Sequence, residues 1–200
     1  MKIAIDADQV FLDFFGTWKD FAEKVLGRNL KTLNDSYDLY YHYGLSLQEI
    51  FKVAVLFEDA GLWGEIRPIP EAIEVLEGLL DRGHEIHVIT GIPSSFIAQR
   101  EAQLKEIFPK HFNKRFFLHL SKNPYIWFSQ APSKELILKR LKPVFYCDDL
   151  WFHCEEAQKA GVPIIKRIRS VHDGGGKPVV GIEVCSDLPE AIAQLLDTNK

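Results

Sequence analysis

Two carboxylates lie close together near the start of the chain. Asp6 and Asp8 directly follow the apolar run Ile3-Ala4-Ile5, which has the length of a short buried strand. Two such groups can divide the work of phosphoryl transfer, because one can attack phosphorus while the other moves a proton to or from the leaving oxygen. The fragment alone also fits a structural role, in which Asp8 caps the next helix and Asp6 is solvated at the strand end.

A second pair of acids repeats this arrangement late in the chain. Asp148 and Asp149 follow the apolar stretch Val144-Phe-Tyr-Cys147. Carboxylates crowded at strand ends repel one another unless a cation neutralises them, and oxygen ligands without a histidine or cysteine pattern favour Mg²⁺. An exposed acidic turn is the alternative interpretation of this pair taken by itself.

Three further residues could bind a phosphoryl group. Thr90 and Gly91 end a predicted strand, where a hydroxyl and backbone N–H groups can bind phosphoryl oxygens. Lys134 opens a predicted helix, and its ammonium could offset the charge of phosphate and carboxylates. Each residue alone is ordinary, so the signal is the ordered set of acid-x-acid, threonine, lysine and acid pair.

The elements that position these residues alternate between strand and helix. This alternation predicts an α/β fold, a Rossmann-like parallel sheet with helices on both faces. We predict strands over 3–5, 84–90, 115–119, 143–147, 162–166 and 179–184, and helices over 14–25, 46–60, 72–80, 95–107, 134–140, 152–160 and 188–196, whereas 29–43 has no clear period.

One interval is too long for a single strand-helix-strand unit. The first strand ends near Asp8 and the next sheet strand ends at Thr90, roughly 80 residues later, although such a unit needs only about 30. The excess is helical and rich in aromatic residues. We therefore predict an α/β core over 1–12 and 68–200 and an inserted helical cap over 13–67, above the strand ends where open α/β sheets bind substrates.

Composition limits the classes of partner. In 200 residues, 46% are hydrophobic and 26% charged, which is typical of one globular domain. The net charge of −4 and the lack of a lysine- or arginine-rich block argue against large nucleic acids as partners.

No apolar run near Met1 is long enough for a signal peptide or a membrane span, so we expect a cytoplasmic protein with no membrane partner. No pattern indicates an oligomeric state. The three cysteines and seven histidines show no zinc-ligand spacing and are interpreted as structural or exposed.

In order along the chain, these motifs resemble the four motifs of the haloacid dehalogenase-like (HAD) hydrolase superfamily. The motifs are Asp6-Ala-Asp8-Gln-Val10, Thr90, Lys134 and Asp148-Asp149, and they span nearly the whole chain. Two longer stretches are similar to the 5′(3′)-deoxyribonucleotidase branch, in which a small helical cap lies between the first two motifs. These stretches are Asp8-Gln-Val-Phe-Leu-Asp13-Phe14 and Gly61-Leu-Trp63-Gly-Glu-Ile-Arg-Pro-Ile-Pro-Glu-Ala72.

The resemblance implies a Mg²⁺-dependent phosphatase for a small phosphate monoester, a (deoxy)nucleoside monophosphate in this branch. Asp6 would form an aspartyl-phosphate, and Asp8 would act as general acid and then activate the hydrolytic water. Thr90 and Lys134 would hold the phosphoryl group. The resemblance also implies that Mg²⁺ is bound by the Asp6 carboxylate, the Asp8 backbone carbonyl and Asp148, with Asp149 helping through water. Dehalogenases lack an acid at the position of Asp8, so ester hydrolysis is favoured.

Two departures bear on the substrate, because Gln9 stands where the branch usually has glycine and Gly91 where its members often have serine. The aromatic residues Phe14, Trp18 and Trp63 could stack on a nucleobase, although aromatic residues at helical spacing also form cores.

Two alternative functions stay open, a phosphatase for a non-nucleotide ester and a phosphate-binding protein without turnover. A response-regulator receiver domain uses similar residues, but there the acid pair comes first, whereas here it comes last.

Overall fold

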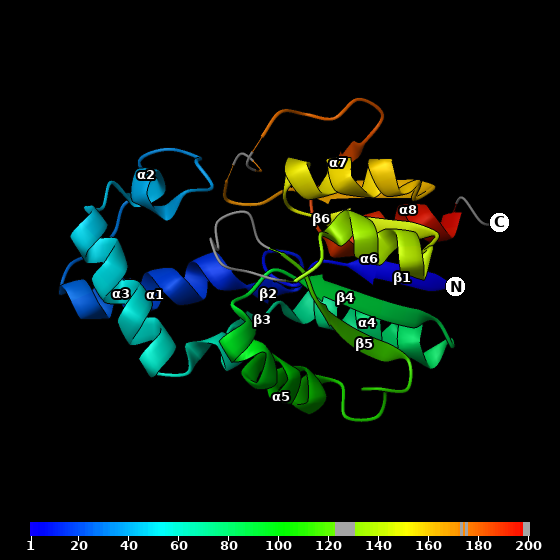
Figure 1. Cartoon of the computed structure of the whole chain (residues 1–200), viewed down its shortest axis with the longest axis horizontal. Helices are drawn as coiled ribbons and strands as arrows, with labels where there is room; N and C mark the ends of the chain where they lie inside the picture. Colours follow the sequence, from blue (N-terminus) through cyan, green and yellow to red (C-terminus); the bar gives the residue numbers. More distant parts are fainter. Residues whose placement is uncertain (123–130, 173, 175, 198–200) are drawn as a thin grey trace.

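A six-stranded sheet forms the centre of the computed structural model, which describes residues 1–122, 131–172, 174 and 176–197. The strand order is β5-β4-β1-β6-β7-β8, and each neighbouring pair is parallel (Figure 1). This arrangement confirms the predicted α/β fold. The strands are β1 (Lys2–Ile5), β4 (Glu85–Thr90), β5 (Phe116–Leu120), β6 (Phe145–Asp148), β7 (Ile164–Ile168) and β8 (Glu183–Cys185).

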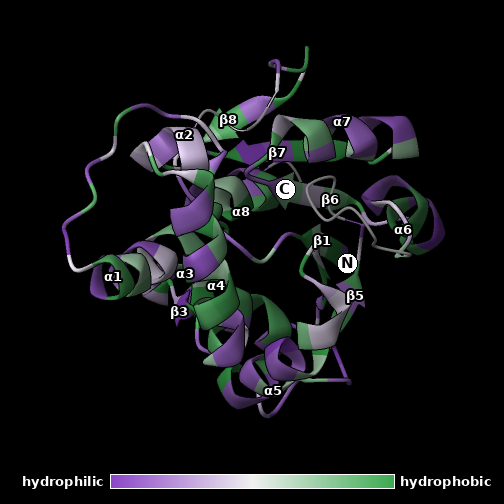
Figure 2. Ribbon diagram, turned by 60° about the vertical axis from the view of Figure 1, so that its left-hand side comes forward, coloured by the Kyte–Doolittle hydropathy of each residue, from purple (hydrophilic) through white to green (hydrophobic). Residues whose placement is uncertain are grey.

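Helices cover both faces of this sheet. Successive side chains of a strand point to opposite faces, so Ile3 and Ile5 pack on one side while Ala4 packs on the other. The helices are banded with hydrophobic and hydrophilic residues, as expected for elements with one buried side (Figure 2). Helices α4 (Pro70–Asp81), α5 (Ile97–Ile107) and α8 (Leu188–Asp197) contribute to the first core, and α6 (Lys134–Leu141) and α7 (Trp151–Ala160) to the second.

A helical insertion interrupts the chain between β1 and β4. It contains α1 (Phe14–Leu26), α2 (Leu39–Tyr43), α3 (Leu47–Asp59) and the short 3-10 helix η1 (Leu62–Gly64). These helices lie beyond the carboxyl end of β1, on the opposite side from the N-terminus (Figure 1).

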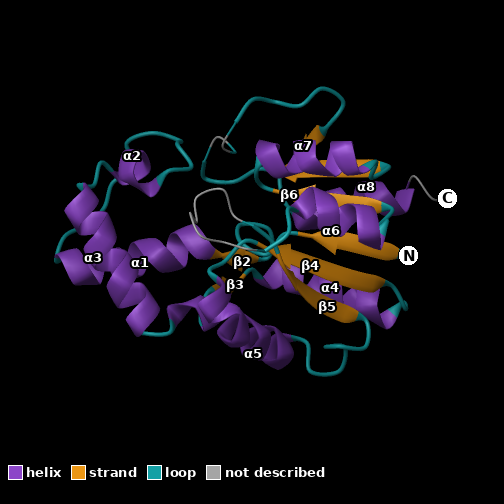
Figure 3. Ribbon diagram, viewed as in Figure 1, coloured by secondary structure: helices purple, strands orange, loops and turns teal. Residues whose placement is uncertain are grey.

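A small antiparallel ribbon joins the two ends of the insertion. Strand β2 (Leu12–Asp13) pairs with β3 (Arg67–Pro68) (Figure 3). An ion pair of 3.0 Å connects Arg67 to Asp13. The sequence did not predict this ribbon, because a strand of two residues has no measurable period.

Local signals in the sequence set several helix ends correctly. Ser46 and Glu49 have the spacing of a capping box and form one at the start of α3, in which each side chain accepts a hydrogen bond from the other residue's backbone N–H. Gly27 follows α1 with a φ of 65°, a left-handed conformation that glycine adopts without steric cost.

Three regions differ from the predictions or exceed them. The predicted strand over 179–184 is wrong in its extent, because β8 pairs with β7 only over Glu183–Cys185. The tract 29–43, which had no clear period, contains α2 at its end. The run Asp173-Gly-Gly-Gly176, whose composition predicts a turn, lies partly outside the described residues. In the part of the chain that the structure describes, no helix combines the length and apolarity needed to cross a membrane.

Candidate active site

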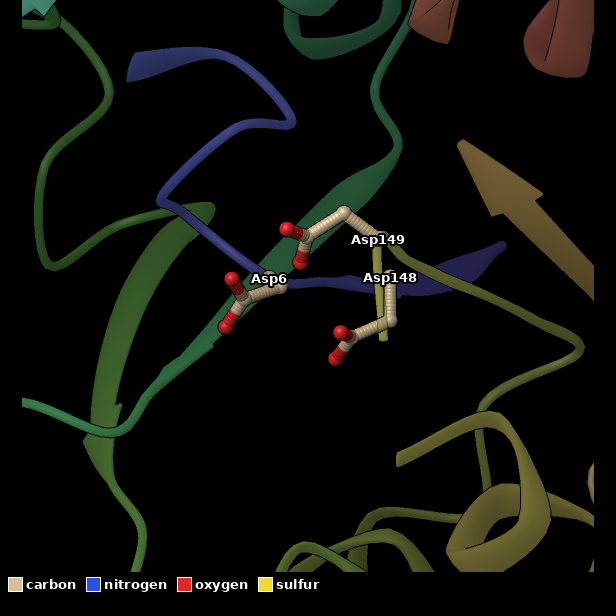
Figure 4. A group of neighbouring side chains, drawn as sticks. All are labelled: Asp6, Asp148 and Asp149. Carbon is tan, nitrogen blue, oxygen red and sulfur yellow. The ribbon is translucent and has the colours of Figure 1, made fainter. Parts of the chain in front are cut away.

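The ends of two adjacent strands bring three carboxylates together. Asp6 follows β1, Asp148 ends β6, and Asp149 comes next in the chain. The two strands are parallel neighbours, and the Asp6 N–H donates to the Cys147 carbonyl at 3.0 Å. One side-chain oxygen from each acid lies within 4.8 Å of the others. The three carboxylates project to the same side of the strand ends (Figure 4).

Lys134 lies among these acids. It is the first residue of α6, whose N-terminus is capped by the Ser133 hydroxyl. Its side chain is buried, and its Nζ donates to Asp6 Oδ1 at 2.5 Å and to Asp148 Oδ2 at 2.8 Å. The structure therefore brings the predicted lysine into direct contact with the predicted nucleophile and with one of the predicted metal ligands.

The acids at this site carry more negative charge than Lys134 can balance. Burial raises the pKa of Asp6 well above its ordinary value, an effect that Lys134 opposes only in part. Burial and the neighbouring Asp148 likewise raise the pKa of Asp149. Burial also acts upward on Asp148, but Lys134, His153 and the Tyr146 hydrogen bond together outweigh it and lower the pKa of that carboxyl. A divalent cation would neutralise this excess negative charge. The three acids offer only carboxylate oxygens as ligands, and such ligands suit Mg²⁺.

Asp148 is held by two further groups. The Tyr146 hydroxyl donates to Asp148 Oδ2, and the Leu150 backbone N–H donates to Oδ1 at 3.0 Å. These contacts fix the carboxylate in one orientation, which is what a ligand for a small cation requires.

A histidine that the sequence analysis treated as structural or exposed contacts Asp149. The Gly174 N–H donates to His172 Nδ1 at 3.0 Å, so the ring proton is on Nε2, which donates to Asp149 Oδ2 at 2.8 Å. The Asp149 carbonyl also accepts a hydrogen bond from Arg167 Nε at 3.0 Å. No sequence spacing signals this contact, because it joins segments that meet only in the fold.

Thr90 offers a hydroxyl at the next strand end. The residue is fully buried, and its carbonyl accepts hydrogen bonds from the Ser121 N–H and hydroxyl. Its own Oγ1 has no hydrogen-bond partner among the described residues. A buried hydroxyl without a partner is costly, so this atom is suited to donate to a bound anion.

Asp8 lines the same cavity as Asp6 and Asp149 but has a different partner. It lies in a tight turn in which the Ala7 carbonyl accepts from the N–H groups of Val10, Phe11 and Leu12 at 3.0–3.3 Å. The Asp8 Oδ1 accepts a hydrogen bond from Arg100 Nη2 at 2.9 Å. Asp8 does not belong to the group of carboxylates that could hold a metal. No sequence signal points to Arg100, because a lone arginine in a helix is normally solvated.

A small cavity of about 40 Å³ lies at these residues. Of the three aromatic residues predicted for a substrate pocket, Phe14 lines this cavity, but Trp18 and Trp63 are not among its lining residues. Trp18 stacks on Tyr43 inside the insertion at 5.9 Å, and Trp63 stacks on Phe14 at 5.5 Å. The described lining residues are Asp6, Asp8, Gln9, Phe14, Phe15, Tyr37, Gly91, Lys134, Asp149, Leu150 and His153.

Five of these lining residues were not predicted. Phe15, Tyr37, Leu150 and His153 were given no functional role from the sequence, and Gln9 was noted only as a departure. Burial, with the nearby Lys134 ammonium, lowers the pKa of His153, and its Nδ1 lies 2.9 Å from Glu156. Gln9, Phe15 and Leu150 directly follow the predicted residues Asp8, Phe14 and Asp149, and this adjacency is the sequence signal for them, whereas no motif indicated Tyr37 or His153.

The fold and the residues at its strand ends define a HAD-like hydrolase. A family model described as 5′ nucleotidase, deoxy (pyrimidine), cytosolic type C protein (NT5C) matches residues 1–121, more than half of the chain. The chain belongs to this family. The match includes Asp6, Asp8 and Thr90, whereas Lys134 and the late acid pair lie beyond it.

Solved structures of similar fold are HAD-like proteins with low sequence identity. A HAD family hydrolase from Deinococcus radiodurans R1, with bound phosphate and sodium, has a TM-score of 0.62 and 14% identity over 99% of this chain and 96% of that one. A putative phosphatase from Clostridium difficile has a TM-score of 0.61 and 16% identity over 98% and 97%. A D,D-heptose bisphosphate phosphatase from B. bronchiseptica, complexed with magnesium and phosphate, has a TM-score of 0.56 and 12% identity over 98% of each chain. No curated protein matches the sequence significantly.

Proposed function

We propose that the protein is a Mg²⁺-dependent phosphatase that hydrolyses a small phosphate monoester through an aspartyl-phosphate, and that its substrates are (deoxy)nucleoside monophosphates. The observation that carries this proposal is the contact of Lys134 with both Asp6 and Asp148, beside the unpartnered Thr90 hydroxyl. The proposed nucleophile Asp6 and the Lys134 ammonium thus line one small cavity, and the Thr90 hydroxyl lies at the end of the neighbouring strand β4.

The proposed reaction has two steps. An Asp6 carboxylate oxygen attacks phosphorus, the bond to the ester oxygen breaks, and Asp8 gives its proton to the leaving alcohol. Asp8 then takes a proton from a water molecule, which attacks the phosphorus of the aspartyl-phosphate and releases inorganic phosphate. Lys134 and Thr90 hold phosphoryl oxygens in both steps, which fixes the phosphorus in line with Asp6.

Asp6, Asp148 and Asp149 would hold the Mg²⁺, together with the Asp8 carbonyl. The bound ion would supply positive charge to neutralise the phosphoryl oxygens. The magnesium and phosphate bound to the B. bronchiseptica phosphatase, whose fold is similar, support this assignment.

We propose that residues 13–67 act as a cap and residues 1–12 and 68–200 as the catalytic core. The insertion supplies Phe14, Phe15 and Tyr37 to the cavity wall, and the β2–β3 ribbon joins its two ends. The cavity of about 40 Å³ is far smaller than ordinary ligand pockets of roughly 300–1,000 Å³. A whole nucleotide therefore requires the insertion to shift outward. Membership of the nucleotidase family supports the choice of substrate.

The nucleophile is tested by replacing Asp6. We expect wild-type protein to hydrolyse 4-nitrophenyl phosphate only with Mg²⁺, and Asp6→Asn to lower kcat by on the order of 10³-fold or more. Asp81→Asn serves as the control, because Asp81 is an exposed acid at the end of α4 whose partner is His111. Borohydride reduction during turnover should convert Asp6 to homoserine, which mass spectrometry detects. Equal inertness of wild type and Asp6→Asn would support the phosphate-binding alternative.

The substrate is tested by comparing kcat/KM for nucleoside monophosphates, sugar phosphates and aryl phosphates. A tenfold preference for deoxynucleoside monophosphates, about 1.4 kcal/mol in the barrier, would support the nucleotidase assignment. A preference of that size for a sugar phosphate would overturn it and favour the non-nucleotide alternative.

A further inference from the structure

Arg100 is a buried charge that the proposed reaction steps do not use. It lies on α5, and its side chain has no exposed surface. Its Nη2 donates to Asp8 Oδ1 at 2.9 Å, and Asp8 is its only carboxylate partner among the described residues. An arginine stays protonated when it is buried, so it requires a stable anionic or polar partner. In this structure Asp8 is that partner.

The same guanidinium also contacts the insertion. Its Nε donates to the Trp63 carbonyl at 3.3 Å. Trp63 belongs to η1, and its ring stacks between Phe14 of α1 at 5.5 Å and Phe96 at 6.1 Å. Arg100 thus connects Asp8 to the segment where the insertion returns to the core.

The packing of α5 against η1 is close. A Cβ atom added to Gly64 would lie 3.1 Å from the Gln99 backbone carbonyl oxygen, a closer approach than most Cβ atoms make. One turn further along α5, Gln103 Nε2 donates to the Ile66 carbonyl at 2.6 Å. A displacement of this segment would therefore be transmitted to α5 through backbone contacts as well as through Arg100.

Hydrogen bonding along this contact is incomplete. Among the described residues, four buried side-chain atoms without a partner belong to it: Trp63 Nε1, Gln99 Oε1, Arg100 Nη1 and Gln103 Oε1. Unsatisfied buried polar groups cost free energy, and apolar side chains of similar size would avoid that cost. These polar side chains therefore stabilise the contact less than apolar ones would. This cost favours a functional role for the polar residues between α5 and η1.

We infer that Arg100 is a positioning residue for Asp8, and that it links the orientation of this acid to the position of the insertion. The inference rests on the proposed function, in which Asp8 moves the proton of the leaving group. The side chain of Asp8 is 23% exposed, and Arg100 holds Oδ1, while Oδ2 has no hydrogen-bond partner among the described residues. A proton donor must be aligned to act, and a displacement of about 1 Å can cost on the order of 10²-fold in rate.

Substrates with different leaving groups separate this role from a structural one. The leaving group of 4-nitrophenyl phosphate is a stable phenolate that needs no proton, whereas the alkoxide of a nucleoside 5′-monophosphate or glycerol phosphate does. We expect Arg100→Met to lower kcat/KM for the alkyl ester by on the order of 10²-fold and for the aryl ester by less than about fivefold. The ratio kcat/KM excludes the later hydrolysis of the aspartyl-phosphate, so that step does not obscure the comparison.

Two variants complete the experiment. Gln103→Met is the matched control, because Gln103 lies on the same helix face and contacts the same returning segment without touching Asp8. We expect it to leave the ratio of alkyl to aryl kcat/KM unchanged. In the Asp8→Asn background, Arg100→Met should cause no further loss for the alkyl ester, because residues that act as a unit are not additive.

The experiment distinguishes failure of the positioning role of Arg100 from failure of the proposed phosphatase function. Wild-type protein that hydrolyses neither ester with Mg²⁺ would contradict the proposed function itself. An active wild type whose Arg100→Met variant loses both esters equally, or loses alkyl activity again in the Asp8→Asn background, would overturn the positioning role. Should Arg100→Met not fold, Arg100→Lys keeps the charge without the planar fork, and we expect it to show the same selective loss to a smaller degree.

Discussion

At the scale of single residues, Gln9 shows how side-chain contacts hold an unfavourable backbone. Its φ of 60° is in the left-handed region, which glycine adopts without steric cost and other residues adopt with strain. Its Oε1 accepts from the Phe15 N–H at 2.9 Å, and its Nε2 donates to the Ser170 hydroxyl at 3.3 Å. The first contact satisfies an N–H group at the start of α1 that has no partner within the helix. A glutamine thus replaces the glycine usual in this branch and ties the turn after Asp8 to two other segments.

Substitution of Gln9 separates the strain from the contacts. Gln9→Gly removes both, and we expect its free energy of unfolding to change by no more than about 1 kcal/mol, because the two effects oppose each other. Gln9→Ala keeps the left-handed strain and loses the hydrogen bonds. We expect it to be less stable than Gln9→Gly by about 1 kcal/mol in urea unfolding. Equal stability of the two variants would contradict the strained conformation.

At the scale of elements, β4 and β5 carry a pair of histidines across the sheet. His87 Nδ1 lies 3.0 Å from His119 Nε2, and the His87 ring stacks on Phe117 at 5.0 Å. Burial lowers the pKa of His87, although Glu85, 3.6 Å away, acts in the opposite direction and Lys2 adds to the lowering. Burial and the neighbouring His87 lower the pKa of His119. The two strands therefore pair most stably with both rings neutral.

This pair predicts how stability changes with pH. The unfolded histidines take up protons near pH 6.5, while the native pair stays neutral to lower pH, so the unfolded state binds more protons in this window. Stability should fall as pH falls through 6.5 towards the native pKa values. We expect the double variant His87→Gln/His119→Gln to show a weaker dependence of the free energy of unfolding on pH. The slope should fall by up to about 1.4 kcal/mol per pH unit for each histidine, measured by urea unfolding from pH 7 downward. The same dependence of unfolding free energy on pH in wild type and double variant would exclude the two histidines as the cause of the change in stability.

At the scale of the whole molecule, two parts meet at the carboxyl ends of the strands. The sheet places Asp6, Asp148 and Thr90 at one edge, and the insertion covers that edge with the side chains of Phe14 and Tyr37. The β2–β3 ribbon is the joint between the two parts. The proposed outward shift of the insertion would leave the strand ends in place, since the core does not depend on the helices of the insertion for its sheet pairing.

Metal binding should be visible in the stability of the whole molecule. Mg²⁺ that binds only the native site stabilises by mass action, about 2.7 kcal/mol when its concentration is 100 times its Kd. For a chain of this size we expect a rise in Tm of roughly 5–10 °C on adding saturating Mg²⁺, reversed by a chelator. Asp149→Asn should reduce the shift and Asp81→Asn should retain it, which thermal unfolding can measure. No shift in wild-type protein at millimolar Mg²⁺ would argue against a metal at these acids.

The sequence by itself determined the class of fold and which acids lie at the strand ends. Apolar runs buried on both faces specify strands of a parallel sheet, and parallel strands necessarily end at the same edge. Asp6, Thr90 and Asp148, which follow or end such strands, could therefore be placed together from the sequence alone. The capping box at Ser46 was predictable for a similar reason, because its contacts are local in the chain.

Only the tertiary structure decided which groups contact these residues from distant segments. The partners Asp8 and Arg100 are separated by 92 positions, and His172 lies 23 positions from Asp149. Periodicity reports which face of an element is buried, but it does not report which two buried faces meet. For the same reason the sequence could not separate Phe14, which lines the cavity, from Trp18, which packs inside the insertion. Local interactions set the elements, and their packing set the contacts around Asp6 and Asp8.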